Sequence, residues 1–203
     1  MVVFTVLPIL AGLTVVVVIG LPLLRSYLLH GTIALVRPGS ELQRFLYHSF
    51  TLTLLGYGLL TILLAIGGPD PLGVYLVAPW VSIAGLIVAA GGLALVVIAQ
   101  AQMGRSWRIG IDPAPTGLVT HGVFRFSRNP IYLGIVILTV GVALIAPCGW
   151  TITGSLLVYV LVGFQARAEE EHLLREHGPA FTRWAGRVGR FLPGIGRWPG
   201  PTG

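Results

Sequence analysis

The sequence predicts an all-α integral membrane protein with about five transmembrane helices. The chain of 203 residues is 55% hydrophobic and only 10% charged, and its mean hydropathy is +0.87. It contains several apolar runs of about 20 residues, the length at which a helix crosses the hydrocarbon core of a bilayer. The sequence shows no second domain and no internal repeat, so we expect residues 1–203 to form a single membrane domain.

Three transmembrane helices are expected in the N-terminal part, residues 1–99. The first apolar run, residues 2–24, has no basic segment before it and exceeds the length of a signal-peptide core, so we expect a membrane helix. The second helix is predicted over residues 45–66, and the glycines and prolines of 67–73 predict a tight turn after it. The third helix is predicted over residues 77–99.

Residues 100–193 form the second half of the predicted domain. A polar stretch at its start precedes two short apolar segments, residues 131–146 and 151–166, which Pro147-Cys-Gly149 separates. Sixteen helical residues reach only about 24 Å, against roughly 30 Å of hydrocarbon, so these segments predict a short hairpin, either tilted or re-entrant. Because both ends of a hairpin emerge on one side, the polar motifs that flank it should come together.

The polar end of the chain predicts C-terminal interfacial helices. From Glu169 onward, apolar and aromatic residues recur at helical spacing, as at Leu173, Phe181 and Trp184, which is typical of a helix that lies in the membrane interface. Gly178-Pro179 predicts a break in this helix. Residues 194–203 are expected to be a flexible tail.

The 13 basic residues, all arginines, test this layout. They lie around the first predicted loop, in the stretch 100–129 and in the tail, whereas Asp70 is the only charge in the other two connections. Cytoplasmic loops of membrane proteins carry an excess of basic residues. Five spans with an external N-terminus and a cytoplasmic C-terminus place every arginine on the cytoplasmic side.

Glycines mark the positions at which helices are expected to pack closely. Gly85 and Gly92 lie in the third predicted helix, and Gly134 and Gly141 lie in the fourth. Small residues let the backbones of membrane helices approach one another. We therefore expect tight helix–helix contacts at these four positions.

The first candidate site motif is Arg128-Asn129-Pro130, immediately before the fourth predicted helix. Asparagine can cap a helix and proline favours its first turn, so helix initiation accounts for two of the three residues. It does not account for Arg125 with Arg128, which membrane topology explains in part, or for Tyr132. Free backbone N–H groups at a helix start, together with guanidinium donors, can receive an anion.

The second candidate motif is Glu169-Glu170-Glu171. Glu171 is four residues before an arginine, a spacing typical of ion pairs on a solvated helix surface. Glu169 and Glu170 have leucines at that spacing instead, and Arg167 is close by. Glu169 and Glu170 are therefore the better candidates for facing a site.

Arginine, glutamate, asparagine and tyrosine at a cytoplasmic membrane surface suit a zwitterionic cofactor such as S-adenosyl-L-methionine. Carboxylates can bind its hydroxyls or ammonium group, and arginine can bind its carboxylate. The sequence has no glycine-rich dinucleotide loop after a strand and no Walker loop. The five histidines show no metal-ligand spacing and Cys148 is the only cysteine, so no metal site is expected.

Residues 118–134 resemble the signature of the isoprenylcysteine carboxyl methyltransferase and phospholipid methyltransferase superfamily, in which the core commonly reads Arg-His-Pro-x-Tyr-x-Gly. That superfamily consists of integral membrane methyltransferases. A second set of residues is similar to the superfamily's C-terminal pattern: Glu169-Glu170, Leu173, Gly178, Phe181 and Arg190-Phe-Leu-Pro193. The resemblance covers residues 100–193, with the motifs in the right order. It implies that residues 100–193 are the cofactor-binding, catalytic half and that the polar stretch before the fourth helix is a cytoplasmic cofactor-binding loop.

The resemblance implies an S-adenosylmethionine-dependent methyltransferase embedded in the membrane. The cofactor site would be lined by Arg128, Asn129, Pro130, Tyr132, Leu133 and Gly134, with Glu169 and Glu170. The catalytic candidates are Glu169, Glu170 and Arg167, the last of which lies near the place of a family arginine. The family usually has histidine at position 129 and tyrosine at position 181, so Asn129 lacks a protonatable group and Phe181 lacks a hydroxyl.

The acceptor is expected to be a lipophilic molecule that enters between the helices. Four aromatic residues could line this entrance or simply anchor the protein in the interface: Trp107, Phe124, Phe126 and Trp184. We expect carboxyl methylation of an isoprenylcysteine-like substrate, and a phospholipid amine is the alternative. An amine would need a general base, which Glu169 or Glu170 could supply. An NADPH-dependent sterol-type reductase and a non-catalytic membrane protein are further alternatives, and no nucleic-acid partner is expected.

Overall fold

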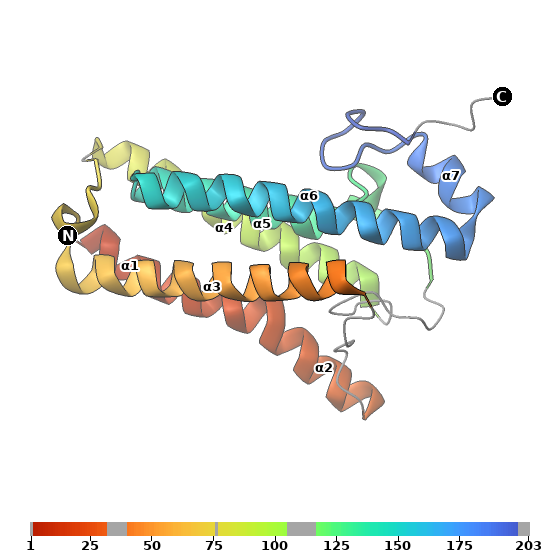
Figure 1. Cartoon of the computed structure of the whole chain (residues 1–203), viewed down its shortest axis with the longest axis horizontal. Helices are drawn as coiled ribbons and strands as arrows, with labels where there is room; N and C mark the ends of the chain where they lie inside the picture. Colours follow the sequence, from red (N-terminus) through yellow and green to blue (C-terminus); the bar gives the residue numbers. More distant parts are fainter. Residues whose placement is uncertain (1, 32–39, 76, 105–116, 199–203) are drawn as a thin grey trace.

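The computed structural model describes residues 2–31, 40–75, 77–104 and 117–198. They form a bundle of long helices with a smaller helical part at one end (Figure 1). The α-helices are α1 (Val2–Val15), α2 (Leu21–His30), α3 (Glu41–Gly67), α4 (Pro79–Met103), α5 (Pro130–Ile145), α6 (Gly149–His177) and α7 (Pro179–Ala185). The short helices are the π-helix η1 (Val16–Gly20) and the 3-10 helices η2 (Asp70–Leu72) and η4 (Gly122–Arg125).

The described part of the chain is an all-α membrane fold, as the sequence predicts. Four of its helical segments are long and apolar enough to cross a membrane: Val6–Leu28, Glu41–Gly67, Pro79–Met103 and Gly149–His177. The fifth apolar helix, α5, has only 16 residues, which corresponds to about 24 Å. The short fourth segment of the sequence prediction is therefore confirmed, whereas its partner in the hairpin is longer than expected.

Helix α6 corrects the predicted boundary at residue 166, because it continues without a break to His177. The carboxylate motif and the predicted start of an interfacial helix therefore lie on the same rigid helix as the last membrane segment. The residues after 166 are mostly strong helix formers, and Arg167 and Glu171 face each other one turn apart. Gly178, with φ of +47°, ends the helix, and Pro179 begins α7, so the predicted break is in the right place.

The first membrane segment also runs past its expected end, from α1 through η1 to His30. Its wider π-helical turns lie beside the polar end of α4. The side-chain amide of Gln100, on α4, donates a hydrogen bond of 2.8 Å to the carbonyl of Val18. Gln100 is buried, so this bond satisfies a polar side chain and a helix carbonyl where water is scarce.

Glycines bring α4 and α5 into backbone contact, which confirms the prediction for these four residues. A Cβ atom added at Gly92 would lie 2.6 Å from the carbonyl oxygen of Gly134, and one at Gly85 would lie 2.8 Å from that of Gly141. A Cβ atom at Gly141 would lie 2.5 Å from the backbone nitrogen of Ala89. This contact fixes the position of α5, and hence of the motif at its start, against α4.

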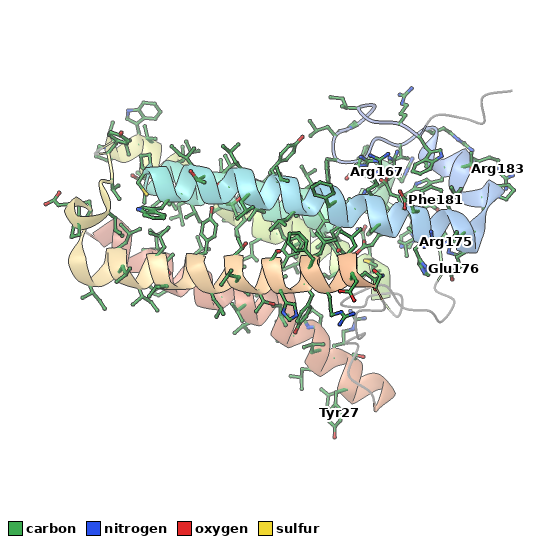
Figure 2. All side chains as sticks on the ribbon, in the orientation of Figure 1. Tyr27, Arg167, Arg175, Glu176, Phe181 and Arg183 are labelled. Carbon is green, nitrogen blue, oxygen red and sulfur yellow. The ribbon has the colours of Figure 1, made fainter. Side chains whose placement is uncertain are left out.

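The polar segments of the chain gather at one end of the bundle. The start of α3, helix η4, the last turns of α6, α7 and residues 186–198 lie at this end, and the turns at 68–75 and 146–148 lie at the other (Figure 1). Arg167, Arg175 and Arg183 all lie toward the polar end (Figure 2). Asp70, in η2, belongs to the opposite end. The described arginines thus have the one-sided distribution that the sequence predicts.

Candidate active site at the start of α5

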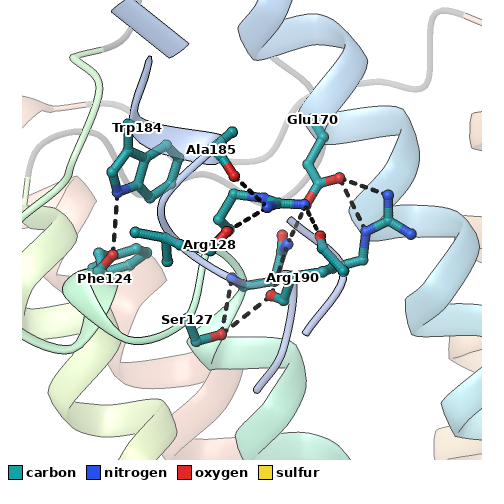
Figure 3. Close-up of polar contacts among 10 residues, drawn as sticks. Phe124, Ser127, Arg128, Glu170, Trp184, Ala185 and Arg190 are labelled. Atoms are coloured by element: carbon teal, nitrogen blue, oxygen red, sulfur yellow. Dashed lines mark hydrogen bonds and ion pairs between the residues drawn. The ribbon is translucent and has the colours of Figure 1, made fainter. Parts of the chain in front are cut away.

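The candidate residues meet where α5 begins and where α6 passes beyond the bundle. Arg128 and Asn129 precede α5, and Glu169 and Glu170 lie on α6. Because α5 and α6 form an antiparallel hairpin, residues about 20 positions before and after its turn lie at the same height. The two motifs therefore come together (Figure 3).

Arg128 is a buried hub of hydrogen bonds. Its side chain is 1% exposed, and its Nε donates to Oε1 of Glu170 at 2.9 Å. Nη1 donates to the carbonyls of Ala185, at 3.0 Å, and Val188, at 2.5 Å. Nη2 donates to the carbonyl of Gly196 at 3.0 Å. All three guanidinium nitrogens therefore have acceptors inside the protein, and Arg128 is not the free anion donor that its position at a helix start suggests.

Glu170 is the carboxylate at the centre of this cluster, and its side chain is 1% exposed. Its Oε1 accepts from Arg128 and from the side-chain amide of Asn129, each at 2.9 Å. Its Oε2 accepts from Nε of Arg190 at 3.0 Å, and Nη2 of Arg190 lies at 2.9 Å. A buried carboxylate requires such pairing, and the four donors occupy both of its oxygens.

Asn129 stands at the N-cap position of α5, but its side chain makes no capping hydrogen bond, which corrects the prediction that it caps the helix. Its amide nitrogen donates instead to Glu170 and, at 3.3 Å, to the carbonyl of Arg190. The buried carboxylate is the stronger acceptor. Pro130 follows at the first helical position, as predicted.

Residues 186–198, here called the C-terminal strap, run back along the start of α5. The backbone nitrogen of Arg128 donates to the carbonyl of Gly189 at 3.0 Å, and that of Asn129 donates to the carbonyl of Arg190 at 3.1 Å. Ser127 and Gly189 form a parallel bridge, which is the only strand-type pairing in the part of the chain that the structure describes. The strap thus joins α5 through its main chain.

The strap is itself folded tightly. A Cβ atom at Gly189 would lie 1.9 Å from the carbonyl oxygen of Leu192, so only glycine fits there. At the far end, the backbone nitrogen of Trp198 donates to the carbonyl of Ala185 at 3.0 Å, and its ring packs edge-on against Phe181. These contacts hold Trp198 against α7, within the stretch 194–203 for which the sequence suggests a flexible tail, and residues 199–203 lie outside the described part.

A second polar contact lies beside the buried cluster. The hydroxyl of Tyr132, on the first turn of α5, donates to Oε1 of Glu169 at 2.5 Å. The side-chain amide of Gln165 donates to the same oxygen at 2.9 Å. Glu169 is only half-buried, and its Oε2 has no hydrogen-bond partner among the described residues. It is therefore the carboxylate of the pair that retains acceptor capacity.

The other predicted site residues have different surroundings. The side chain of Arg167 is 70% exposed and faces Glu171, at 3.7 Å, so the structure does not bring it to the buried cluster. Gly134 packs against α4, and Leu133 is half-buried in the first turn of α5.

The four aromatic residues of the predicted entrance separate. Phe124 is buried and Phe126 is 62% exposed, whereas Trp107 lies outside the described residues. The indole nitrogen of Trp184 donates to the carbonyl of Phe124 at 3.3 Å (Figure 3), which ties α7 to η4. Phe126 is thus the described member that is most open to lipid or to a ligand.

Sequence reasoning missed two residues of the site, Gln165 and Arg190. Gln165 is one helical turn before Glu169, a spacing that could have indicated the contact. Arg190 belongs to the Arg-Phe-Leu-Pro motif, but its approach to Glu170 depends on the path of the strap. Its side chain is 31% exposed, and its Nη1 has no acceptor among the described residues, so it retains donor capacity that Arg128 lacks.

The available groups fit a zwitterionic ligand. The free oxygen of Glu169 can accept from an ammonium or hydroxyl group, and the free edge of Arg190 can donate to a carboxylate. The cluster of Arg128, Arg190 and Glu170 carries one excess positive charge, which favours an anionic group next to it. The described residues thus offer an acceptor at Glu169 and a donor at Arg190, rather than at Arg128, for the oppositely charged groups of a zwitterion.

Comparisons with known proteins agree with this picture. Residues 80–180, about half of the chain, match the model of a family described as phospholipid methyltransferase. A solved structure of the eukaryotic intramembrane Ras methyltransferase ICMT (isoprenylcysteine carboxyl methyltransferase) superposes with a TM-score of 0.57 and 21% identity. The match covers 88% of this chain and 63% of that one, and at this identity it shows a shared fold. No curated protein matches the chain.

Proposed function

We propose that this protein, whose residues 80–180 belong to the phospholipid methyltransferase family, is an integral membrane methyltransferase that uses S-adenosylmethionine and methylates a lipophilic acceptor. One observation carries the proposal. The segment that bears the family's pattern is also the segment whose polar residues gather at the start of α5, with the Tyr132–Glu169 contact beside the buried cluster. The arginines described at this end of the bundle support a cytoplasmic position for the site, because basic residues are usually enriched on that side of membrane proteins.

The protein's task in such a reaction is to bind and orient. When bound, S-adenosylmethionine supplies an electrophilic methyl group on a sulfonium centre. Glu169 would bind its ammonium or a ribose hydroxyl through the free oxygen, while Tyr132 and Gln165 hold the other oxygen in place. The donors on Glu169 reduce the conformations open to its carboxylate, so positioning rather than proton transfer is its main contribution.

We infer that the acceptor is a carboxylate on an isoprenylcysteine-like molecule. A carboxylate oxygen attacks a methyl group without losing a proton, so no general base is needed. Glu170 cannot act as a base, because both of its oxygens already accept hydrogen bonds from arginine and asparagine. The likeness of the fold to a carboxyl methyltransferase supports the same class.

A phospholipid amine is the second candidate acceptor. The name of the matching family favours it, and Glu169 is a carboxylate with acceptor capacity that could remove the amine proton. The two classes give chemically different products, because an ester is cleaved by mild base and a methylated amine is not.

The arrangement of the chain around the site completes the proposal. The N-terminus would lie outside, and α1 to α4 would form the membrane scaffold on which residues 100–193 build the catalytic half. A lipophilic acceptor would approach from the bilayer past the exposed Phe126.

The test is methyl transfer by the purified full chain in detergent. The protein is incubated with radiolabelled S-adenosylmethionine and either a farnesylcysteine analogue or phosphatidylethanolamine, and the lipid products are treated with base. We expect a base-labile product from the farnesylcysteine analogue, which Glu169→Gln reduces at least about tenfold. Glu171→Gln is the matched control, since Glu171 lies two residues further on the same helix and faces the surface.

Three results decide between the readings. A base-stable product from phosphatidylethanolamine alone would assign the amine class instead. Binding of NADPH without binding of S-adenosylhomocysteine would refute methyl transfer altogether. Equal activities in Glu169→Gln and Glu171→Gln would remove Glu169 from the site.

A further inference from the structure

We propose that the two adjacent glutamates have separate tasks: Glu170, with Arg128, is a positioning residue that seats the C-terminal strap beside the site, and Glu169 alone contacts the methyl donor. This inference rests on the proposed function, and it divides a motif whose members look equivalent in the sequence. Neighbouring helical residues point about 100° apart, so the two carboxylates of α6 cannot share the same surroundings.

Glu170 is buried, and both of its carboxylate oxygens already accept hydrogen bonds. Its side chain is 1% exposed, and its two oxygens accept from Arg128, Asn129 and Arg190 at distances between 2.9 and 3.0 Å. A ligand could reach it only by displacing one of these charged or amide donors. Leaving a buried guanidinium without its carboxylate is unfavourable. S-adenosylmethionine must therefore find its hydrogen-bond acceptors at another residue.

The two arginines that pair with Glu170, Arg128 and Arg190, also attach the strap. Arg128, held on one side by Glu170, donates on its other side to the carbonyls of Ala185, Val188 and Gly196. These acceptors bracket the strap from its beginning to near its end. Arg190, within the strap, returns to the other oxygen of Glu170. Glu170, on α6, therefore connects to the strap in two ways: through Arg128 at the start of α5 and directly through Arg190 (Figure 3).

The strap contacts the start of α5, close in sequence to Tyr132, which contacts Glu169. It is bonded to the backbone of Arg128 and Asn129, one helical turn before Tyr132, whose hydroxyl contacts Glu169. Movement of the strap would therefore shift the start of α5 and change the contact between Tyr132 and Glu169. Glu170 thus acts on ligand binding through the strap, without touching the ligand.

The test compares Glu169→Gln, Glu170→Gln and the control Glu171→Gln with two measurements on the full chain in detergent. The first is the rate of tryptic cleavage after Arg187 and Arg197, both exposed in the strap, in the absence of ligand. The second is the affinity for S-adenosylhomocysteine. For Glu170→Gln we expect faster cleavage together with weaker binding, each by roughly tenfold or more.

For Glu169→Gln we expect the wild-type cleavage rate and a similar loss of affinity, and for Glu171→Gln neither change. Arg190→Gln provides a second variant in case Glu170→Gln does not fold, because Glu170 then keeps Arg128 and Asn129 as donors. It should accelerate cleavage after Arg187, though less than Glu170→Gln. Wild-type cleavage of Arg190→Gln would contradict the seating of the strap.

Two further outcomes would overturn the proposal in different ways. Loss of binding in Glu170→Gln with an unchanged cleavage rate would mean that Glu170 contacts the donor directly. Fast cleavage of Glu169→Gln would mean that Glu169 also holds the strap. If the wild type does not bind S-adenosylhomocysteine, yet Glu170→Gln is cleaved faster, the proposed function fails and the seating role of Glu170 stands.

Discussion

The contact between α4 and α5 predicts opposite effects for two adjacent substitutions, Gly91→Ala and Gly92→Ala. At Gly92 a Cβ atom would lie 2.6 Å from the carbonyl oxygen of Gly134 and from the backbone nitrogen of Leu138. At Gly91 nothing lies within 4 Å of the added atom. The two substitutions add the same methyl group to the same helix, so their difference isolates the packing of α4 against α5.

The magnitude follows from the overlap. Ordinary contacts of a Cβ atom begin at 3.4 Å, so Gly92→Ala requires the two backbones to separate locally by about 0.8 Å, and overpacking of this kind costs about 1–3 kcal/mol. Gly91→Ala should instead stabilise the helix by about 0.5–1 kcal/mol, because alanine favours helix more than glycine does. The free energies of unfolding of the two variants should therefore differ by roughly 1.5–4 kcal/mol.

The assay is thermal unfolding of both variants in the same detergent, together with binding of S-adenosylhomocysteine. We expect Gly92→Ala to melt at least about 4 °C below Gly91→Ala. It should also bind more weakly, because a displaced α5 moves Tyr132 away from Glu169. Equal melting temperatures would refute the backbone contact between α4 and α5. Lower stability with wild-type binding would show that the position of α5 does not control the site.

Three further substitutions test the site and the strap. Arg128→Lys keeps the charge but cannot reach four acceptors at once, so it should accelerate tryptic cleavage after Arg187. An unchanged rate would show that the hydrogen bonds of Arg128 do not hold the strap. Gly189→Ala should loosen the strap at least as much, because its Cβ atom would overlap the carbonyl of Leu192, and wild-type thermal stability would contradict that tight turn. Phe181→Tyr restores the family's usual residue but buries a hydroxyl at a fully buried position. We expect it to lower the free energy of unfolding by about 1–3 kcal/mol, and an unchanged melting curve in denaturant would show that a partner for the hydroxyl exists.

The sequence was sufficient for those features that depend on composition and spacing. Apolar runs predict the membrane helices, the four glycines predict the close packing, and the hairpin predicts that Arg128 and Glu170 lie together. The sequence pattern predicts too early an end for α6, because polar residues begin at position 167 while the helix continues to His177. Polarity marks the end of a membrane segment, whereas a helix ends at a breaker, here Gly178.

The division of roles within the site could not be predicted in the same way. From the local sequence, Asn129 is expected to cap α5 and Arg128 to bind an anion. In the structure both side chains donate to Glu170 instead. That outcome depends on the strap, whose return path is fixed by the tight turn at Gly189 and by the packing of Trp198 on Phe181. The hydrogen bonds of Arg128 to Ala185, Val188 and Gly196 join residues 57 to 68 positions apart, so no local pattern in the chain indicates them.

The way in which Arg128 holds the strap has a consequence for sequence variation. Its acceptors there are main-chain carbonyls, which every amino acid provides. Apart from Arg190 and the glycine at 189, the exposed side chains of the strap, such as Leu192 and Ile195, can be exchanged without loss of the attachment. A protein of this design can therefore diversify the surface beside its site while keeping the site in place.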